Sequence, residues 1–277
     1  MAPRLAPPRV SDVEVSFPTE HILLARLNRP KHLNAIRRDM HPELARLWDW
    51  YDAQPSLRCA VITGTDRAFC AGADLKEWNN KNDEGVNSGK DRDATWATSG
   101  FGGLSNRRGK KPIIAAVNGL CLGGAMEMIL NVDMVIASDA AKFGLPEVKR
   151  GVVAVAGALP RIIRSVGRQR ASEMALLGRM YSAEDMLAWG LVNHVVKQPQ
   201  VLEEALRWAG EVADNSPDSI IVSRAGLMGG WDAQDPIAST NSIENGIYKG
   251  LDGGENMKEG VVSFVEKRAP RWRDSKL

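Results

Sequence analysis

Three short runs of apolar residues, each leading into turn-forming residues, place the strongest limit on how this chain can fold. They are "CAVITG" (59–64), "IIAAVN" (113–118) and "DMVIAS" (133–138). A short apolar run bounded by turn residues is typical of a buried β-strand. Two earlier segments, "VEVSF" (13–17) and "HILLARLN" (21–28), also predict strands, the first by its alternation. The first part of the chain therefore contains several strands, most of them buried.

Helical patterns lie between these strands. One predicted helix has Asp39 as its N-cap and runs through "MHPELARLWDWYDAQ", where its apolar side chains share one face: Leu44, Leu47, Trp48 and Tyr51. Another begins at the adjacent glycines Gly123 and Gly124. Residues 1–200 are therefore expected to form an α/β body, with a polar surface loop near residues 77–100.

The pattern changes at about Val201. Four segments between there and residue 268 have helical periodicity, and no strand is predicted between them. The sequence thus predicts two regions, an α/β core over 1–200 and an all-helical C-terminal region over 201–277.

Composition excludes some classes of protein. Of 277 residues, 44% are apolar and 25% are charged, which is ordinary for a soluble globular protein, and a net charge of +2 gives no reason to expect nucleic acid or a membrane as partner. Cys59, Cys70 and Cys121 lie in apolar contexts without metal-ligand spacing, so buried thiols in a reducing compartment are expected. No uninterrupted apolar segment has the length of a membrane span, and prolines interrupt the N-terminal "MAPRLAPPRV", so neither a membrane-spanning nor a secreted protein is expected.

The segment "CLGGAMEMIL" (121–130) places two glycines at the start of a helix that follows a buried strand. Unpaired N–H groups at a helix start attract anions, and glycine lets a ligand approach them closely. A glycine pair alone is better explained by close packing of a helix on a strand. However, "RAFCAGADLKEW" (67–78) also follows a buried strand and also brings small residues to a turn. Two N–H donors facing one oxygen would form an oxyanion hole.

Two carboxylates belong to the same region. Glu127 lies one helical turn beyond Gly124 in an apolar run where a charge is costly, and Glu147 follows Pro146. Burial and proximity raise carboxyl pKa values, which would give an acid and a base near neutral pH. Alternatively, Glu147 forms a surface ion pair with Lys149 or Arg150.

These residues resemble the enoyl-CoA hydratase/isomerase family, the crotonase superfamily, over nearly the whole chain. The similar segments follow one another in the order of the family: "LNRPKHLNAI", "VITGTDRAFCAGADLKE", "KKPIIAAVNGLCLGGAMEMILNVDMVIASDAAKFGLPEVKRG", "LLGRMYSAEDMLAWGLVNHVV" and "EGVVSFVEKRAP". The resemblance implies a crotonase-like spiral of β-β-α repeats, with a helical C-terminal region used for trimers or dimers of trimers. It also implies a coenzyme A thioester as the substrate, with no prosthetic group and no metal.

The resemblance also assigns residues. The N–H groups of Ala73 and Gly124 match the oxyanion hole, and the Ala71 region matches the site that lines the adenine of CoA, with Asp74 beside it as a further CoA-binding residue. Further CoA contacts are implied for Lys31, near the phosphates, and for Phe264 and Lys267, which in this family often reach a neighbouring subunit.

Glu127 and Glu147 match the two positions used for hydration. In the implied mechanism, Glu127 activates water for attack at C3 and Glu147 delivers a proton to C2. The chain has Ala154 and Val155 where many hydratases have Pro-Gly, so we expect a reshaped acyl pocket and a substrate that is not a simple straight-chain enoyl-CoA. The alternatives are an isomerase that relies on Glu147, a related dehydratase or lyase, and a non-catalytic acyl-CoA binder.

The final residues Ser275, Lys276 and Leu277 match the C-terminal address that the peroxisomal import receptor reads. The charged, proline-containing segment before them is expected to leave them accessible. The sequence therefore predicts a eukaryotic source and a peroxisomal location, which suits an acyl-CoA enzyme of fatty-acid oxidation.

Overall fold

The main sheet of the protein has six strands. The computed structural model describes residues 6–75, 77, 99–232 and 235–277. The strand order is β1-β2-β3-β5-β7-β10, with β1 antiparallel to β2 and the other neighbours parallel. The strands are β1 (Val13–Thr19), β2 (Ile22–Leu27), β3 (Cys59–Gly64), β5 (Ile113–Val117), β7 (Met134–Ser138) and β10 (His194–Val196). All five strands predicted from the sequence are confirmed, whereas the predicted loop at 77–100 lies almost entirely outside the described residues.

A second sheet consists of four three-residue strands in the order β4-β6-β8-β9. They are β4 (Ala68–Cys70), β6 (Leu120–Leu122), β8 (Lys142–Gly144) and β9 (Met180–Ser182). Strands β4, β6 and β8 each follow a strand of the main sheet directly, so the chain adds one strand to each sheet in turn as it winds. This is the spiral that the resemblance implies.

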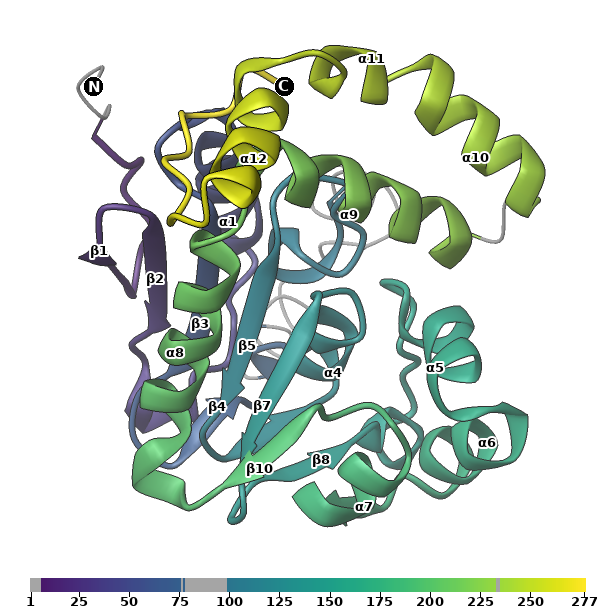
Figure 1. The fold of residues 1–277 in the computed structure, drawn as a ribbon. Coiled ribbons are helices and arrows are strands. Elements are labelled where there is room, and N and C mark those ends of the chain that lie inside the picture. Colours follow the sequence, from purple (N-terminus) through teal and green to yellow (C-terminus); the bar gives the residue numbers. More distant parts are fainter. Residues whose placement is uncertain (1–5, 76, 78–98, 233–234) are drawn as a thin grey trace.

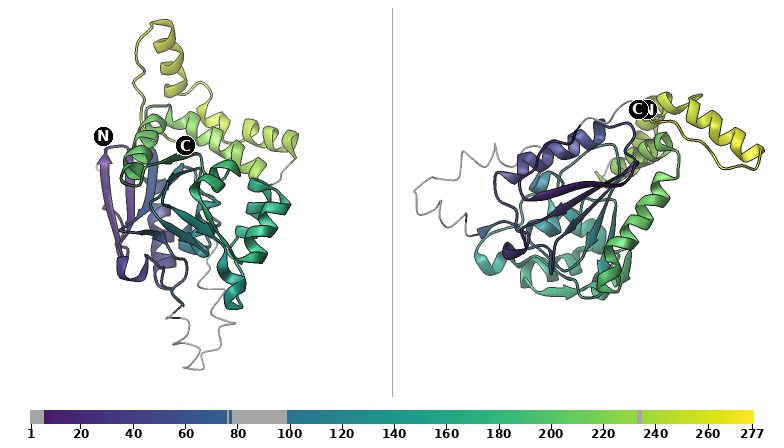
Figure 2. Two further views of the ribbon diagram at one scale, coloured as in Figure 1. Left: turned by 90° about the horizontal axis from the view of Figure 1, so that it is seen from below. Right: turned by 90° about the vertical axis from the view of Figure 1, so that its left-hand side faces the viewer.

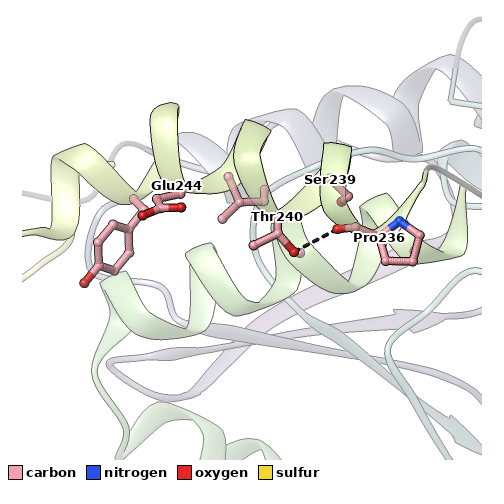
Figure 3. A pocket seen from close by; sticks show the side chains of 8 residues that line it. Pro236, Ser239, Thr240 and Glu244 are labelled. Atoms are coloured by element: carbon pink, nitrogen blue, oxygen red, sulfur yellow. Dashed lines mark hydrogen bonds between the residues drawn. The ribbon is translucent and has the colours of Figure 1, made fainter.

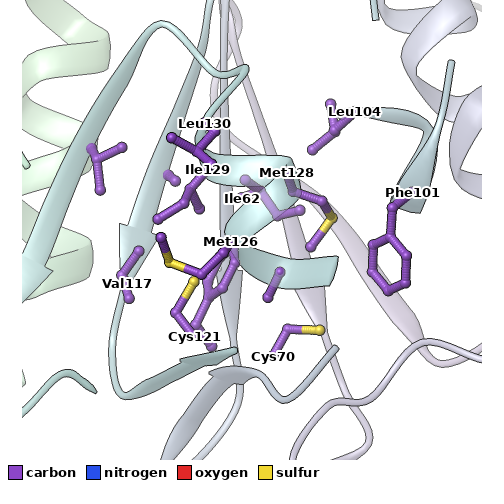
Figure 4. Packing of buried hydrophobic residues seen from close by; sticks show 14 of the residues in the cluster. Ile62, Cys70, Phe101, Leu104, Val117, Cys121, Met126, Met128, Ile129 and Leu130 are labelled. Atoms are coloured by element: carbon purple, nitrogen blue, oxygen red, sulfur yellow. The ribbon is translucent and has the colours of Figure 1, made fainter. Parts of the chain in front are cut away.

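Helices cover both faces of the main sheet (Figure 1). On β3, Cys59 and Val61 pack toward α8 (Val201–Ala213), while Ala60 and Ile62 belong to the other cluster, which includes α1 (Met40–Ala53) and α4 (Gly124–Ile129). Successive strand residues point to opposite faces, so continuous apolar runs are required where both faces are buried. Figure 4 shows Met126, Met128 and Ile129 of α4 packed among buried side chains of the strands, such as Ile62 and Val117.

Helix α1 confirms the predicted apolar face, because Leu44, Leu47, Trp48 and Tyr51 are all buried. The prediction that Asp39 caps this helix is correct in position and wrong in mechanism. Its side chain makes no capping hydrogen bond and instead forms an ion pair with Arg37.

The rest of the described chain is mainly helical. Before α8 come α5 (Ala158–Val166), α6 (Arg168–Leu177) and α7 (Ala183–Ala188), and after it come α9 (Pro217–Trp231), α10 (Pro236–Asn245), α11 (Tyr248–Leu251) and α12 (Glu255–Val265). Short 3₁₀ turns are η1 (Pro30–His32), η2 (Phe101–Gly103), η3 (Pro146–Arg150) and η4 (Gln198–Gln200). From Val201 onward the described residues include no strand, as the sequence predicts, and α12 projects from the body of the protein (Figure 2).

The three cysteines are buried free thiols. Within the described residues, none of the helices has both the length and the apolar character needed to cross a bilayer.

Candidate active site

The start of α4 presents the first N–H donor. Strand β6 ends at Leu122, and Gly123 turns the chain with φ +58°, a conformation that favours glycine, so that the helix begins at Gly124. The N–H of Gly124 lies in the first helical turn, where no intrahelical acceptor exists, and no hydrogen bond is recorded for it among the described residues.

The loop after β4 presents the second donor beside the first. Gly72 has φ +90°, and a Cβ placed on it would lie 3.1 Å from the Gly124 nitrogen, so the two loops are in contact. Backbone hydrogen bonds hold this loop in place: Ala71 N–H donates to Leu33 O over 3.0 Å, and Ile36 N–H donates to Gly72 O over 2.9 Å. For the N–H of Ala73, no acceptor is recorded among the described residues. The structure thus brings together the two amides expected from the sequence.

Gly124 also serves packing. A Cβ on Gly124 would lie 2.4 Å from the ring of Phe101, which is buried. The explanation by close packing and the explanation by a donor N–H are therefore both supported by the geometry at this glycine.

Glu127 lies in the first turn of α4 and is only 3% exposed. Burial raises its pKa to about 7, with a further increase from the nearby Glu147, and hydrogen bonds from backbone N–H groups oppose the rise. One of these is the N–H of Ala158, at the start of α5, which donates to Glu127 Oε2 over 3.1 Å. Glu127 is thus fixed in position and can hold or release a proton near neutral pH.

Glu147 faces the same region from η3. A Cβ on Gly123 would lie 3.1 Å from Glu147 Oε1, so this carboxylate lies against the turn that starts α4. Burial raises the pKa of Glu147, and its Oε2 is buried without a hydrogen-bond partner in the described structure. The alternative of a surface ion pair with Lys149 or Arg150 is wrong, because the carboxylate of Glu147 is buried and its Oε2 has no partner among the described residues.

A cavity of about 110 Å³ lies where these groups meet. One wall comes from the loop after β4, a second from α4 and Phe101, and a third from η3 and the residues after it. The lining residues are Ala71, Ala73, Leu75, Phe101, Gly123, Gly124, Glu127, Pro146, Glu147, Arg150, Val152, Val153 and Val155. The cavity therefore contains two carboxylates, lies against both backbone donors, and is otherwise mostly apolar.

Phe101 is a cavity residue that the sequence analysis missed. Its ring packs edge-on against His41, with the centroids 4.6 Å apart, and His41 Nδ1 accepts a hydrogen bond from Gly102 N–H over 2.9 Å. Burial lowers the pKa of His41 to about 4, so the ring stays neutral and can accept that bond at neutral pH. No sequence pattern indicated Phe101 as a cavity residue, because it follows a polar segment and only the fold places it beside α4.

Four residues that the resemblance assigns to CoA do not line the cavity. Lys31 is exposed on η1, next to the loop that holds Ala71. The carboxylate of Asp74 forms an ion pair with Arg29, with Nη2 and Oδ2 3.0 Å apart. Phe264, on α12, is 85% exposed, and Lys267 follows that helix.

The segment that departs from Pro-Gly contributes to the cavity. Val155 lines it at its solvent side and is 72% exposed, whereas Ala154 is buried. This segment leads into α5, whose first N–H binds Glu127. Val155 thus forms part of the cavity wall, and the reshaped acyl pocket expected from the sequence stays a prediction.

A second cavity, of about 560 Å³, lies between α9 and α10 (Figure 3). Among the described residues that line it, Glu244 is the one with a charged side chain. The hydroxyl of Thr240 donates to Pro236 O over 2.8 Å. A single carboxylate without a nearby base or backbone donor is poorly suited to acid–base chemistry. The smaller cavity is therefore the better candidate for an active site.

The raised pKa of Glu127 predicts a measurable effect on stability. In the unfolded chain this carboxyl has a pKa near 4.5, and in the folded protein it has a pKa of about 7. Between these values the folded state binds more protons, so its stability falls as pH rises, by about 3 kcal/mol in total. We expect Glu127→Gln to remove this loss. The free energy of unfolding of the variant, relative to that of the wild type, should therefore increase between pH 5 and pH 8. Free energies of unfolding from denaturant titrations at both pH values test this, and identical pH dependence in both proteins would contradict it.

Comparisons with known proteins agree with this geometry. Residues 18–275 match the model of the family described as enoyl-CoA hydratase/isomerase. The mevalonyl-coenzyme A hydratase of Beauveria bassiana is 68% identical over 274 residues, which cover 98% of each chain. The mevalonyl-coenzyme A hydratase of Aspergillus fumigatus is 51% identical over 272 residues, again 98% of each chain. Both similarities extend over both predicted regions.

A solved structure gives the same result for the fold. The crystal structure of an enoyl-CoA hydratase from Bacillus anthracis superimposes with a TM-score of 0.86 at 30% sequence identity, covering 96% of this chain and 100% of that one.

Proposed function

This chain belongs to the enoyl-CoA hydratase/isomerase family, the crotonase superfamily, and we propose that it acts on mevalonyl-CoA, removing or adding water across C2 and C3 of the acyl group. The product of water loss is a 3-methyl-branched 2-enoyl-CoA that keeps the hydroxyl on C5.

The substrate rests on one observation, the 68% identity to a mevalonyl-coenzyme A hydratase over 98% of each chain. The cavity supports it, because Val152, Val153 and Val155 form an apolar wall near the carboxylates, where a methyl branch on C3 can pack. A branched substrate also agrees with the expectation that the acyl group is not a simple straight chain.

In the proposed mechanism, the thioester oxygen accepts hydrogen bonds from the N–H groups of Ala73 and Gly124. Negative charge develops on that oxygen as the C2 proton leaves. Two donors fixed in advance stabilise this charge more than they stabilise the neutral thioester, and this lowers the barrier.

The two carboxylates exchange one proton with the substrate. In dehydration, ionised Glu147 takes the proton from C2, the C3–O bond breaks, and protonated Glu127 gives its proton to the departing hydroxide. The products are water and the enoyl thioester, and the pair has moved one proton from Glu127 to Glu147. Hydration runs through the same steps in reverse, with Glu127 activating water and Glu147 protonating C2. The pKa of about 7 at Glu127 suits both roles near neutral pH.

Turnover of four thioesters tests the proposal: mevalonyl-CoA, its dehydrated product, crotonyl-CoA and a 3-enoyl-CoA. The reaction can be followed by the absorbance of the conjugated enoyl thioester, with products identified by mass spectrometry. We expect the highest kcat/KM for mevalonyl-CoA and its product. Conversion of the 3-enoyl-CoA as the main activity would instead establish an isomerase, and no turnover of any thioester would favour a non-catalytic binder.

We also propose import into peroxisomes through Ser275, Lys276 and Leu277. The tail lies against the protein rather than free of it: Lys276 pairs with Glu255 over 2.7 Å, and Lys110 Nζ donates to Leu277 O. The receptor must displace these contacts, which is feasible because the Lys276 side chain is 81% exposed. A fluorescent protein fused to the N-terminus should colocalise with a peroxisomal marker, and deletion of residues 275–277 should make it cytosolic. A diffuse signal from the intact fusion would argue against the address.

A trimer, or a dimer of trimers, is the proposed assembly. Apolar side chains are exposed on the C-terminal helices, namely Leu227, Ile237, Val261, Phe264 and Val265. Burial of such a surface between copies would stabilise an oligomer and would give Phe264 and Lys267 a partner. Sedimentation equilibrium should give a mass of three or six chains, and a monomer would contradict this proposal.

A further inference from the structure

The wall that holds Glu147 also carries a cation. Arg150 is the last residue of η3, is exposed to solvent, and lines the cavity together with Glu147. Side chains three residues apart in a 3₁₀ helix lie one above the other. The side chains of Glu147 and Arg150 are therefore expected on the same side of the turn, and both line the cavity.

Arg150 has no recorded hydrogen bond or ion pair with any residue that the structure describes. Two other arginines of the α/β core have partners: Arg29 pairs with Asp74 over 3.0 Å, and Arg161 donates to Asn106 over 2.8 Å. The residues after Arg150 along the cavity wall are Val152, Val153 and Val155, which offer no side-chain acceptor. A guanidinium has five N–H donors and no acceptor, so an oxygen of the bound ligand is its natural partner.

The positions of the other groups indicate which oxygen this is. If the thioester oxygen lies at Ala73 and Gly124, and C2 and C3 lie between the two carboxylates, the remaining lining available to the acyl group beyond C3 includes Arg150 and the valines. Glu127 Oε2 is already bound to Ala158 N–H, and Glu147 is needed at C2. Among the described lining side chains, Arg150 is then the donor left for a polar group farther along the acyl chain.

We propose that Arg150 is a specificity-determining residue, whose guanidinium donates a hydrogen bond to the C5 hydroxyl of the acyl group. This assignment rests on the proposed function, because it presumes an acyl group with an oxygen two carbons beyond C3. An alkyl chain of the same length leaves the guanidinium without that partner, so the site discriminates against it.

The test compares two thioesters that differ by one oxygen, 5-hydroxy-3-methylpent-2-enoyl-CoA and 3-methylpent-2-enoyl-CoA. The readout is the ratio of their kcat/KM values for hydration. Because Arg150 is partly in contact with water, we expect a ratio of about 10 in the wild type, at the lower end for a hydrogen bond to a charged group. In Arg150→Leu the ratio should fall close to one, and Arg150→Lys should give an intermediate value.

Lys149→Leu is the matched control, since Lys149 is an exposed cation on the same turn that does not line the cavity. It should keep the wild-type ratio. If Arg150→Leu lowers kcat/KM for both thioesters equally, the ratio is unchanged and the proposal is wrong. Arg150 would then hold the CoA portion, which the two thioesters share. An unchanged ratio with unchanged kcat/KM values would also contradict the proposal. If the wild type hydrates neither thioester yet hydrates crotonyl-CoA, the proposed substrate itself fails, and this assignment fails with it.

Discussion

Replacement of either carboxylate by its amide, in Glu127→Gln or Glu147→Gln, is expected to lower kcat for the hydratase reaction at least about 100-fold, the usual scale of general acid–base catalysis. Glutamine keeps the size of the side chain and, at Glu127, an oxygen that can accept the N–H of Ala158. What it removes is the ability to carry a proton. Acyl-CoA affinity, measured by isothermal titration calorimetry with a non-reactive thioether analogue, should change little.

Glu244→Gln is the matched control for this pair, because Glu244 is the carboxylate of the other cavity, between α9 and α10. Its kcat should equal that of the wild type. Hydratase activity that survives both Glu127→Gln and Glu147→Gln would refute the mechanism. If only Glu147→Gln is inactive, the isomerase mechanism gains support, since it needs one carboxylate.

A donor N–H can be removed at Gly124 by proline, and the structure supplies the control. Both Gly124→Ala and Gly124→Pro add a Cβ that would lie 2.4 Å from the Phe101 ring, so both disturb the packing. Only proline also removes the N–H, and the first turn of a helix tolerates it. We expect kcat/KM of Gly124→Pro to be lower than that of Gly124→Ala by about 100-fold or more, equivalent to about 3 kcal/mol of transition-state stabilisation.

Two further measurements make this comparison interpretable. Circular dichroism and the mass of the oligomer must match the wild type for both variants, which shows that each one folds. Equal kcat/KM values for the two folded variants would mean that the Gly124 N–H does not bind the thioester oxygen. The low activity of both would then be due to displacement of Phe101.

The larger elements could be predicted from the sequence because their periodicity is strong. Strand β3 is an unbroken apolar run since both of its faces are covered, and α1 has an apolar stripe since one of its faces is buried. The strands of the second sheet were not predicted. Three residues, as in β4 or β8, are too few to show a period, and such a strand exists only because its neighbours supply hydrogen-bond partners.

The site was predictable where a residue type was out of place. A carboxylate in the apolar run 121–130 indicated Glu127, and glycines after strands indicated the donors. Arg150 entered the sequence analysis only as an ion-pair partner of Glu147, and its place in the cavity depends on the path of η3. Asp39 shows the same limit, because the choice between capping a helix and pairing with Arg37 depends on side-chain geometry that sequence spacing does not define.

The two N–H donors belong to the backbone, which affects how this site tolerates mutation over evolutionary time. A substitution at Ala73 changes the side chain and leaves the N–H in place, because every residue except proline has one. The positions that matter are those that set the path of the chain. They are Gly72 and Gly123, with their positive φ angles, and the parallel strand contact between β4 and β6, where Cys70 lies opposite Cys121. Selection on this part of the site therefore acts largely on conformation, and at Gly124 also on the lack of a side chain, because a Cβ there would lie 2.4 Å from the Phe101 ring.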